Sequence, residues 1–69
     1  MTKCYASTHT ELRLCRSQAE ARRVCAAAYE GGFVYLACEM AGGDLVPAGK
    51  PFMRVAEGGR VVWRVGRSC

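Results

Sequence analysis

Residues 17–40, SQAEARRVCAAAYEGGFVYLACEM, decide the fold, because they contain a helix start, a helix stop and a strand in direct succession. Ser17 and Glu20 have the spacing of a capping box. In that motif the serine hydroxyl accepts a hydrogen bond from the Glu20 amide, and the glutamate carboxylate accepts one from the Ser17 amide. We therefore predict a helix that begins at Ser17.

The predicted helix has a narrow stripe of small side chains at positions i, i+3, i+4 and i+7, namely Ala21, Val24, Cys25 and Ala28. Small side chains allow a helix to lie close to a sheet. We expect Gly31 and Gly32 to supply a left-handed stop at its C-terminal end. Arg22 and Arg23 fall outside the stripe and are expected on a solvated face.

After the glycines, residues 33–40 alternate with the period of a strand. Their even positions are uniformly apolar, namely Val34, Leu36, Cys38 and Met40. Their odd positions mix aromatic and polar character, namely Phe33, Tyr35, Ala37 and Glu39. The even face is predicted to lie under the helix and the odd face on the other side of the sheet.

Residues 3–14 also alternate, and they are compatible either with one long strand or with two short strands joined by a tight loop near residues 7–10. Residues 45–50 are interrupted by Pro47 and Gly49, so we expect an irregular edge or a loop there.

Residues 52–57 and 60–67 flank Gly58 and Gly59 and predict a hairpin. The loop would have three residues, 57–59, with a glycine in a left-handed position, if one face of the hairpin contains Met53, Val55, Val61, Trp63 and Val65. In that register Trp63 is a core anchor.

These elements predict the α+β class: one helix packed on a single antiparallel sheet of about four to five strands, in the order β(β)αβββ. At 69 residues the chain is expected to form a single domain, residues 1–69. We expect a monomer.

The net charge comes from the C-terminal part of the chain. Residues 1–44 contain five basic and five acidic groups, whereas residues 45–69 contain five basic groups and one acidic group, which accounts for the net charge of +4. Clustered positive charge favours an anionic partner.

A sheet with one helix leaves one face uncovered. The hairpin register places four residues on that face alongside Phe33 and Tyr35, namely Arg54, Arg60, Val62 and Arg64. Tyr5 and Arg13 are further candidates. Such a mixture is typical of nucleic-acid binding by stacking and phosphate contacts, of a protein interface anchored by arginine and tyrosine, or of a solvated face with some apolar residues. The predicted partner-binding residues are Arg54, Arg60, Arg64, Tyr35, Phe33, Lys50 and Arg67.

The residues do not indicate an enzyme or a cofactor. His9 is the single histidine, and no nucleophile motif or paired carboxylates lie near it in the sequence. The five cysteines are odd in number and have no C-x-x-C spacing, so we expect free thiols that pack as small apolar residues in a reducing compartment, with Cys69 exposed. No apolar run is long enough for a membrane span and no signal peptide is recognisable, which predicts the cytoplasm.

The order of elements resembles that of the small phage-encoded anti-CRISPR proteins. The resemblance covers about residues 11–67 and rests on ARRV at residues 21–24, GGFVYL at 31–36 and RVVWR at 60–64, in the order strand, serine-capped helix, strand, glycine turn and terminal hairpin. It is closest to those that inhibit type I systems by occupying the crRNA-guided surveillance complex, Cascade.

The resemblance implies a non-enzymatic inhibitor in the host bacterial cytoplasm, which binds Cas subunits of type I Cascade, the Cas7-like backbone above all, and blocks target DNA binding. An excess of four positive charges argues against DNA mimicry, so acidic Cas residues, crRNA phosphates or duplex DNA are the expected contacts. The alternatives are a basic nucleic-acid-binding accessory or regulatory protein of a phage or plasmid, and a component of a toxin and antitoxin pair.

Overall fold

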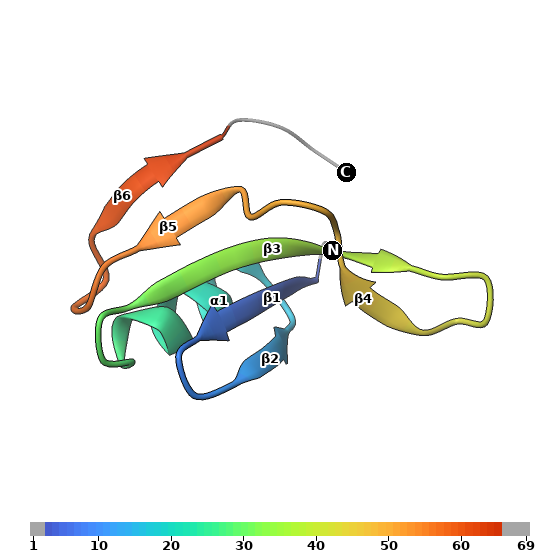
Figure 1. Ribbon diagram of the computed structural model, residues 1–69, viewed down its shortest axis with the longest axis horizontal. Helices are drawn as coiled ribbons and strands as arrows, with labels where there is room; N and C mark the ends of the chain where they lie inside the picture. The colour runs from blue at the N-terminus through green and yellow to red at the C-terminus, as the bar shows by residue number, and fades with distance from the viewer. Residues whose placement is uncertain (1–2, 66–69) are drawn as a thin grey trace.

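The computed structural model describes residues 3–65, which form one helix and six strands (Figure 1). In chain order the elements are β1 (Cys4–Thr8), β2 (Leu12–Cys15), α1 (Gln18–Ala26), β3 (Gly32–Glu39), β4 (Leu45–Pro47), β5 (Met53–Val55) and β6 (Val61–Arg64). The predicted α+β class with one helix on an antiparallel sheet is confirmed. The sheet has more strands than the four to five expected, because residues 4–15 form two strands and residues 45–47 form one.

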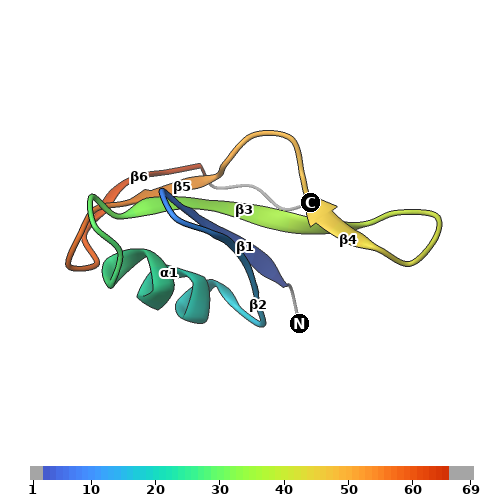
Figure 2. The ribbon, with the colours of Figure 1, turned by 60° about the horizontal axis from the view of Figure 1, so that its bottom comes forward.

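The sheet has the strand order β2-β1-β3-β5-β6, and every pairing is antiparallel. β3 is the longest strand and lies at the centre, where it pairs with β1, β5 and, near its C-terminal end, β4. α1 connects β2 to β3 and lies across one face of the sheet (Figure 2). Within residues 3–65, no helix covers the opposite face of the sheet.

The N-terminal segment is a hairpin and not one long strand. The Thr8 amide donates to the Glu11 carbonyl at 2.8 Å, which leaves an even-numbered loop of two residues between them. An even loop reverses the parity of the second strand relative to the first. Leu12 and Leu14 therefore lie on the face opposite to Cys4, although all three have even numbers.

The helix begins where the capping box predicts. Ser17 is the N-cap residue, with φ −154° and ψ 167°, and its hydroxyl accepts from the Glu20 amide at 3.2 Å. The Glu20 carboxylate accepts from the Arg16 amide at 2.7 Å, one residue earlier than the capping box predicts. Among the described residues, no helix is long and apolar enough to cross a membrane.

The helix ends earlier than the glycines predict. Ala27 is the C-cap residue, with ordinary right-handed dihedrals. The left-handed residues come later, at Glu30 (φ 64°) and Gly31 (φ 72°), where they turn the chain into β3. A side chain at Gly31 would collide with the Val55 carbonyl, so the glycine is required by the close approach of β5 as well as by its φ.

The core between α1 and the sheet consists mainly of small side chains. The buried apolar residues are Cys4, Ala6, Cys15, Ala21, Cys25, Val34, Leu36, Phe52, Met53 and Val55. Three of the cysteines pack here as free thiols, as predicted, and Cys38 is half-buried. Burial raises the pKa of the Cys4, Cys15 and Cys25 thiols, because a thiolate loses its hydration there. Cys69 lies outside the described residues.

Residues 45–50 were expected to be irregular, and the structure shows a short strand followed by a bulge. The Ala48 amide donates to the Leu36 carbonyl at 2.7 Å, and the Phe52 amide donates to the Val34 carbonyl at 2.9 Å. Pro47 is the register partner of Ala37 and Met53 that of Val34, so six residue steps lie opposite three on β3, and the chain between β4 and β5 bulges out by three residues. Lys50 lies in this bulge and is exposed.

We expect Ser17→Ala to lower the free energy of unfolding by about 1 kcal/mol, because it removes the acceptor of the Glu20 amide. Urea denaturation followed by circular dichroism measures the change. Ser17→Asp is the matched control, since aspartate retains a capping acceptor and should stay close to the parent. Equal stability of the alanine variant and the parent would contradict this account of the helix start.

Stability should fall as the pH rises above about 8.5, where exposed thiols ionise. The unfolded chain then releases thiol protons that the folded chain keeps on Cys4, Cys15 and Cys25, so the free energy of unfolding decreases with pH. Each thiol contributes a slope of up to about 1.4 kcal/mol per pH unit. Denaturation of the reduced protein between about pH 8 and pH 10 tests this, and Cys25→Ala should show a shallower dependence than the parent.

Candidate interaction surface

A single row of side chains crosses the sheet on the face opposite α1. Strand register places one residue from each of β2, β1, β3, β5 and β6 in this row, namely Leu12, Ser7, Phe33, Arg54 and Trp63. A second, shorter row beside it contains Leu14, Tyr5 and Tyr35. We call these eight residues the open face.

Phe33, Arg54 and Trp63 form a contact cluster in the part of the open face that extends from the central strand β3 to the edge strand β6. The Arg54 guanidinium carbon lies 4.9 Å from the centroid of the Phe33 ring, a cation–π contact. The Trp63 and Phe33 ring centroids are 6.3 Å apart, with the rings tilted by 53°. Arg54 Nη1 also donates to the Gly32 carbonyl at 3.4 Å. The arginine is therefore held in place by neutral groups.

A bulge in the β5–β6 hairpin brings Trp63 to this face. Arg54 lies opposite Trp63 and Val55 opposite Val61, so Val62 is an extra residue on β6. A bulge of this kind reverses the parity of the strand beyond it. The prediction that Trp63 is a core anchor is therefore wrong, and its side chain is 40% exposed.

The residues beside Trp63 follow the same reversal. Arg64 lies opposite Met53 on the helix side, where its Nη2 donates to Gln18 Oε1 at 3.0 Å. The prediction that Arg64 shares a face with Arg54 is wrong for this reason. Val65, also predicted in the core, is 45% exposed.

The inner half of the hairpin agrees with the prediction. Met53 and Val55 are buried, and Val61 packs against the core. The Ala56 amide donates to the Arg60 carbonyl at 2.7 Å, which leaves the predicted three-residue loop. Both of its glycines have positive φ.

The two tyrosines lie on the open face and are half-buried. Tyr5 and Tyr35 are register partners, and the Tyr5 hydroxyl donates to the Leu45 carbonyl at 2.8 Å. Arg13, a further candidate for this face, lies instead on the helix side opposite Ala6, because of the parity change in the N-terminal hairpin. It forms an ion pair with Glu11 at 3.2 Å.

The open face is apolar and carries little charge. Its exposed members include Leu12 at 52%, Leu14 at 43% and Phe33 at 37% exposure, and Arg54 is its one charged residue. Exposed apolar patches of this kind mark interaction sites, and arginine with aromatic residues in a charge-poor setting is typical of the centre of a protein interface.

Two further predicted residues are not among the eight residues of the open face. Arg60 is exposed at the end of the β5–β6 loop, and Lys50 is exposed in the bulge between β4 and β5. Arg67 lies outside the described residues. Of the seven predicted residues, the structure brings together Phe33, Tyr35 and Arg54.

The sequence analysis missed Leu12, Leu14 and Trp63 as members of this face. Their assignment depends on a two-residue loop and a one-residue bulge. Residues 7–10 contain no glycine or asparagine that would indicate the loop length. The bulge lies in a run of apolar residues that fit either face of a strand.

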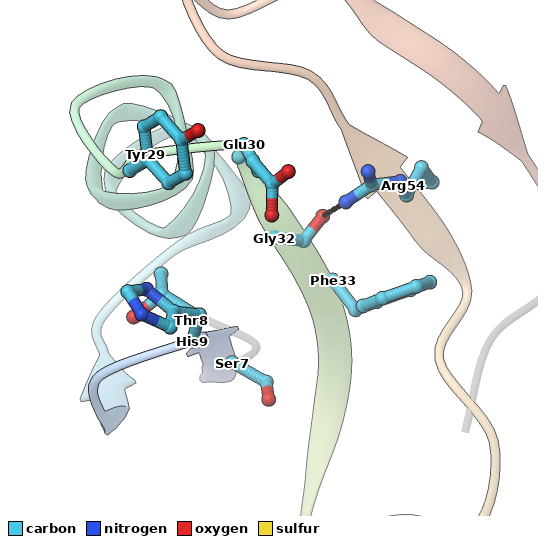
Figure 3. A pocket seen from close by; sticks show the side chains of 9 residues that line it. Ser7, Thr8, His9, Tyr29, Glu30, Gly32, Phe33 and Arg54 are labelled. Atoms are coloured by element: carbon cyan, nitrogen blue, oxygen red, sulfur yellow. Dashed lines mark hydrogen bonds between the residues drawn. The ribbon is translucent and has the colours of Figure 1, made fainter.

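A hollow of about 300 Å³ lies at one end of the open face (Figure 3). His9 and Tyr29 lie on one side of this hollow, and Phe33 and Arg54 lie on the other. The His9 and Tyr29 ring centroids are 6.3 Å apart, and the two rings are arranged edge to face. Glu30, whose φ is 64°, also lines this hollow.

Among residues 3–65, no three histidine, cysteine, aspartate or glutamate side chains lie close enough together to hold a metal ion. Neither a protein-family model, nor a curated protein, nor a solved structure matches the chain. The resemblance to anti-CRISPR proteins therefore rests on the three sequence segments and the order of elements given above.

We expect Trp63→Ala to cost only about 1 kcal/mol of stability, because much of the indole is already in solvent. Phe52, two residues before Arg54, has an aromatic ring in the core and is 3% exposed. Phe52→Ala removes this buried ring and should cost about 3 to 5 kcal/mol of stability. Thermal and urea denaturation of the two variants measure the difference. A loss at Trp63 as large as that at Phe52 would contradict the bulged register.

Proposed function

We propose that the chain is a non-enzymatic binding protein that docks on another protein through its open face. The observation that carries this proposal is the Phe33–Arg54–Trp63 cluster in a row of exposed apolar side chains. Tryptophan, tyrosine and arginine supply most of the energetic anchors of protein interfaces. A side chain already ordered before binding loses less entropy when the complex forms.

The charge on this face favours a protein partner over nucleic acid. A surface that follows a phosphate backbone needs several cations along its path. Here the single arginine already contacts Phe33 and the Gly32 carbonyl, and the Tyr5 hydroxyl donates to a backbone carbonyl. An apolar row of this composition gains more from burial against a protein surface.

The proposed partner is a subunit of a type I CRISPR surveillance complex, the Cas7-like backbone above all, in the cytoplasm of a bacterial host. The order of a serine-capped helix, a central strand and a terminal hairpin supports it, because that order is the basis of the resemblance to anti-CRISPR proteins. A protein seated on the backbone of the complex would occupy the path of the target DNA and prevent its pairing with the guide. The net charge of +4 argues against mimicry of DNA.

We expect the double variant Arg54→Ala with Trp63→Ala to bind a type I complex at least about 30-fold more weakly than the parent, the effect of losing roughly 2 kcal/mol at an interface anchor. The matched control is Arg16→Ala with Met40→Ala, which removes an exposed arginine and an exposed large apolar residue away from the open face. The control should stay within about twofold of the parent. Binding to the purified complex is measured beside phage plaque formation on a CRISPR-immune host.

The outcomes separate the parts of this proposal. Full inhibition by the open-face variant would exclude this surface as the docking site. A parent protein that neither binds a type I complex nor protects phage would exclude the proposed partner. Equal loss of binding to the complex and to bare duplex DNA would favour the alternative, a nucleic-acid-binding regulatory protein. Growth arrest on expression in a host without CRISPR would favour a toxin.

A further inference from the structure

The helix side of the molecule has a groove between α1 and the β5–β6 hairpin. One hollow of about 400 Å³ is lined by Ala19, Arg22, Arg23, Ala26, Gly58 and Gly59. A second of about 180 Å³ is lined by Gln18, Ala19, Arg22, Met53, Val61 and Arg64. The two hollows share Ala19 and Arg22 and thus form one groove. Three arginines line it, and within the described part of the chain no acidic side chain does.

We propose that this groove is a second binding site, separate from the open face, for the phosphodiester backbone of a nucleic acid. It does not rest on the docking function proposed above. The arginines come from two elements far apart in the sequence, α1 and β6, and the fold brings them to the same groove.

The groove arginines are oriented by neutral acceptors. Arg22 Nε donates to the Gly59 carbonyl at 3.0 Å, and Arg64 Nη2 donates to Gln18 Oε1 at 3.0 Å. A guanidinium has five N–H donors, so each arginine keeps most of them for a ligand. Within residues 3–65, the ion pair that the structure shows is that of Arg13 with Glu11 in the β1–β2 hairpin. The positive charge of the groove is therefore not neutralised by a carboxylate.

The wall of the groove allows a polymer backbone to approach closely. Gly58 and Gly59 have φ of 92° and 101°, and a Cβ atom at Gly58 would meet no other atom within 4 Å. The Gly58 amide donates to the Ala26 carbonyl at 2.9 Å, which ties the loop to the end of α1. Ala19 and Ala26 keep the helix side of the groove shallow.

The chemistry of the groove favours phosphate over an acidic protein surface. Planar guanidinium groups match two phosphate oxygens at once, and successive phosphates match arginines spread along a groove. A protein partner would be expected to use an exposed aromatic anchor, and the residues lining this groove include none. The open face and the groove thus have different compositions and suit different partners.

The test measures fluorescence anisotropy of labelled single-stranded RNA, single-stranded DNA and duplex DNA of mixed sequence, at about 50 mM and about 200 mM salt. We expect binding that weakens with salt, with a slope of about −0.7 to −0.9 for each phosphate neutralised. Arg22→Glu with Arg64→Glu should weaken binding at least about tenfold and flatten the slope. The three ligands distinguish a preference for strand or duplex.

The matched control is Lys3→Glu with Lys50→Glu, which changes the net charge by the same amount at two exposed residues outside the groove and the open face. It should weaken binding by no more than about threefold through long-range repulsion. Arg22→Gln with Arg64→Gln repeats the experiment without adding acidic groups, in case the charge reversal unfolds the protein. Circular dichroism verifies that each variant is folded.

Three results would overturn the proposal: no binding of the parent to any of the nucleic acids at the lower salt, equal loss in the groove variant and its charge-matched control, or full binding by the folded glutamine variant. Binding to polyglutamate with no binding to nucleic acid would assign the groove to an acidic protein and likewise overturn it. Because bare nucleic acid is the probe, these outcomes are independent of whether the open face binds a Cas subunit.

Discussion

The rest of the structure depends on the close packing of α1 on the sheet, which only small side chains allow. Ala6, Ala21 and Cys25 are completely buried between the two layers. A Cβ atom on Gly32 would lie 3.0 Å from the Cys25 sulfur and would also collide with the Ser7 carbonyl. Phe52 is the one aromatic ring buried in this core among the described residues. The aromatic side chains of Phe33 and Trp63 lie on the other face of the sheet, which has no second layer of the fold packed on it within residues 3–65.

The parts of the fold that the sequence predicted are those fixed by local chemistry. Ser17 and Glu20 determine the helix start through one hydrogen bond, and the two glycines determine a three-residue hairpin loop. The alternation in β3 correctly predicts that Val34 and Leu36 are buried, whereas Cys38 is half-buried and Met40, also predicted under the helix, is 55% exposed. Each of these depends on residues close together in the chain. Phe33, Tyr35 and Arg54 were assigned to the open face for the same reason. Each lies in a strand segment in which no loop or bulge interrupts the alternation used to assign it.

The wrong face assignments in the C-terminal hairpin, and the failure to place Leu12 and Leu14, come from parity carried across an interruption. A period of two determines the face of a residue only within an unbroken strand. Leu12 and Leu14 lie beyond the two-residue loop, and Trp63 and Arg64 lie beyond the bulge at Val62. Val61, Val62 and Trp63 are all apolar, so the sequence of β6 is compatible with either register. The register that forms keeps Val61 at the core and places the arginine that follows Trp63 beside Gln18.

The bulge also connects the two proposed surfaces. Trp63 and Arg64 are consecutive residues of an edge strand, and they face opposite sides of the sheet, one towards Phe33 and the other towards α1. A partner that wraps around the β6 edge would therefore reach both surfaces at once. A ribonucleoprotein presents both kinds of ligand, an apolar protein surface and a phosphate backbone. Two weak contacts on one rigid domain reinforce each other, because formation of the first raises the effective concentration for the second.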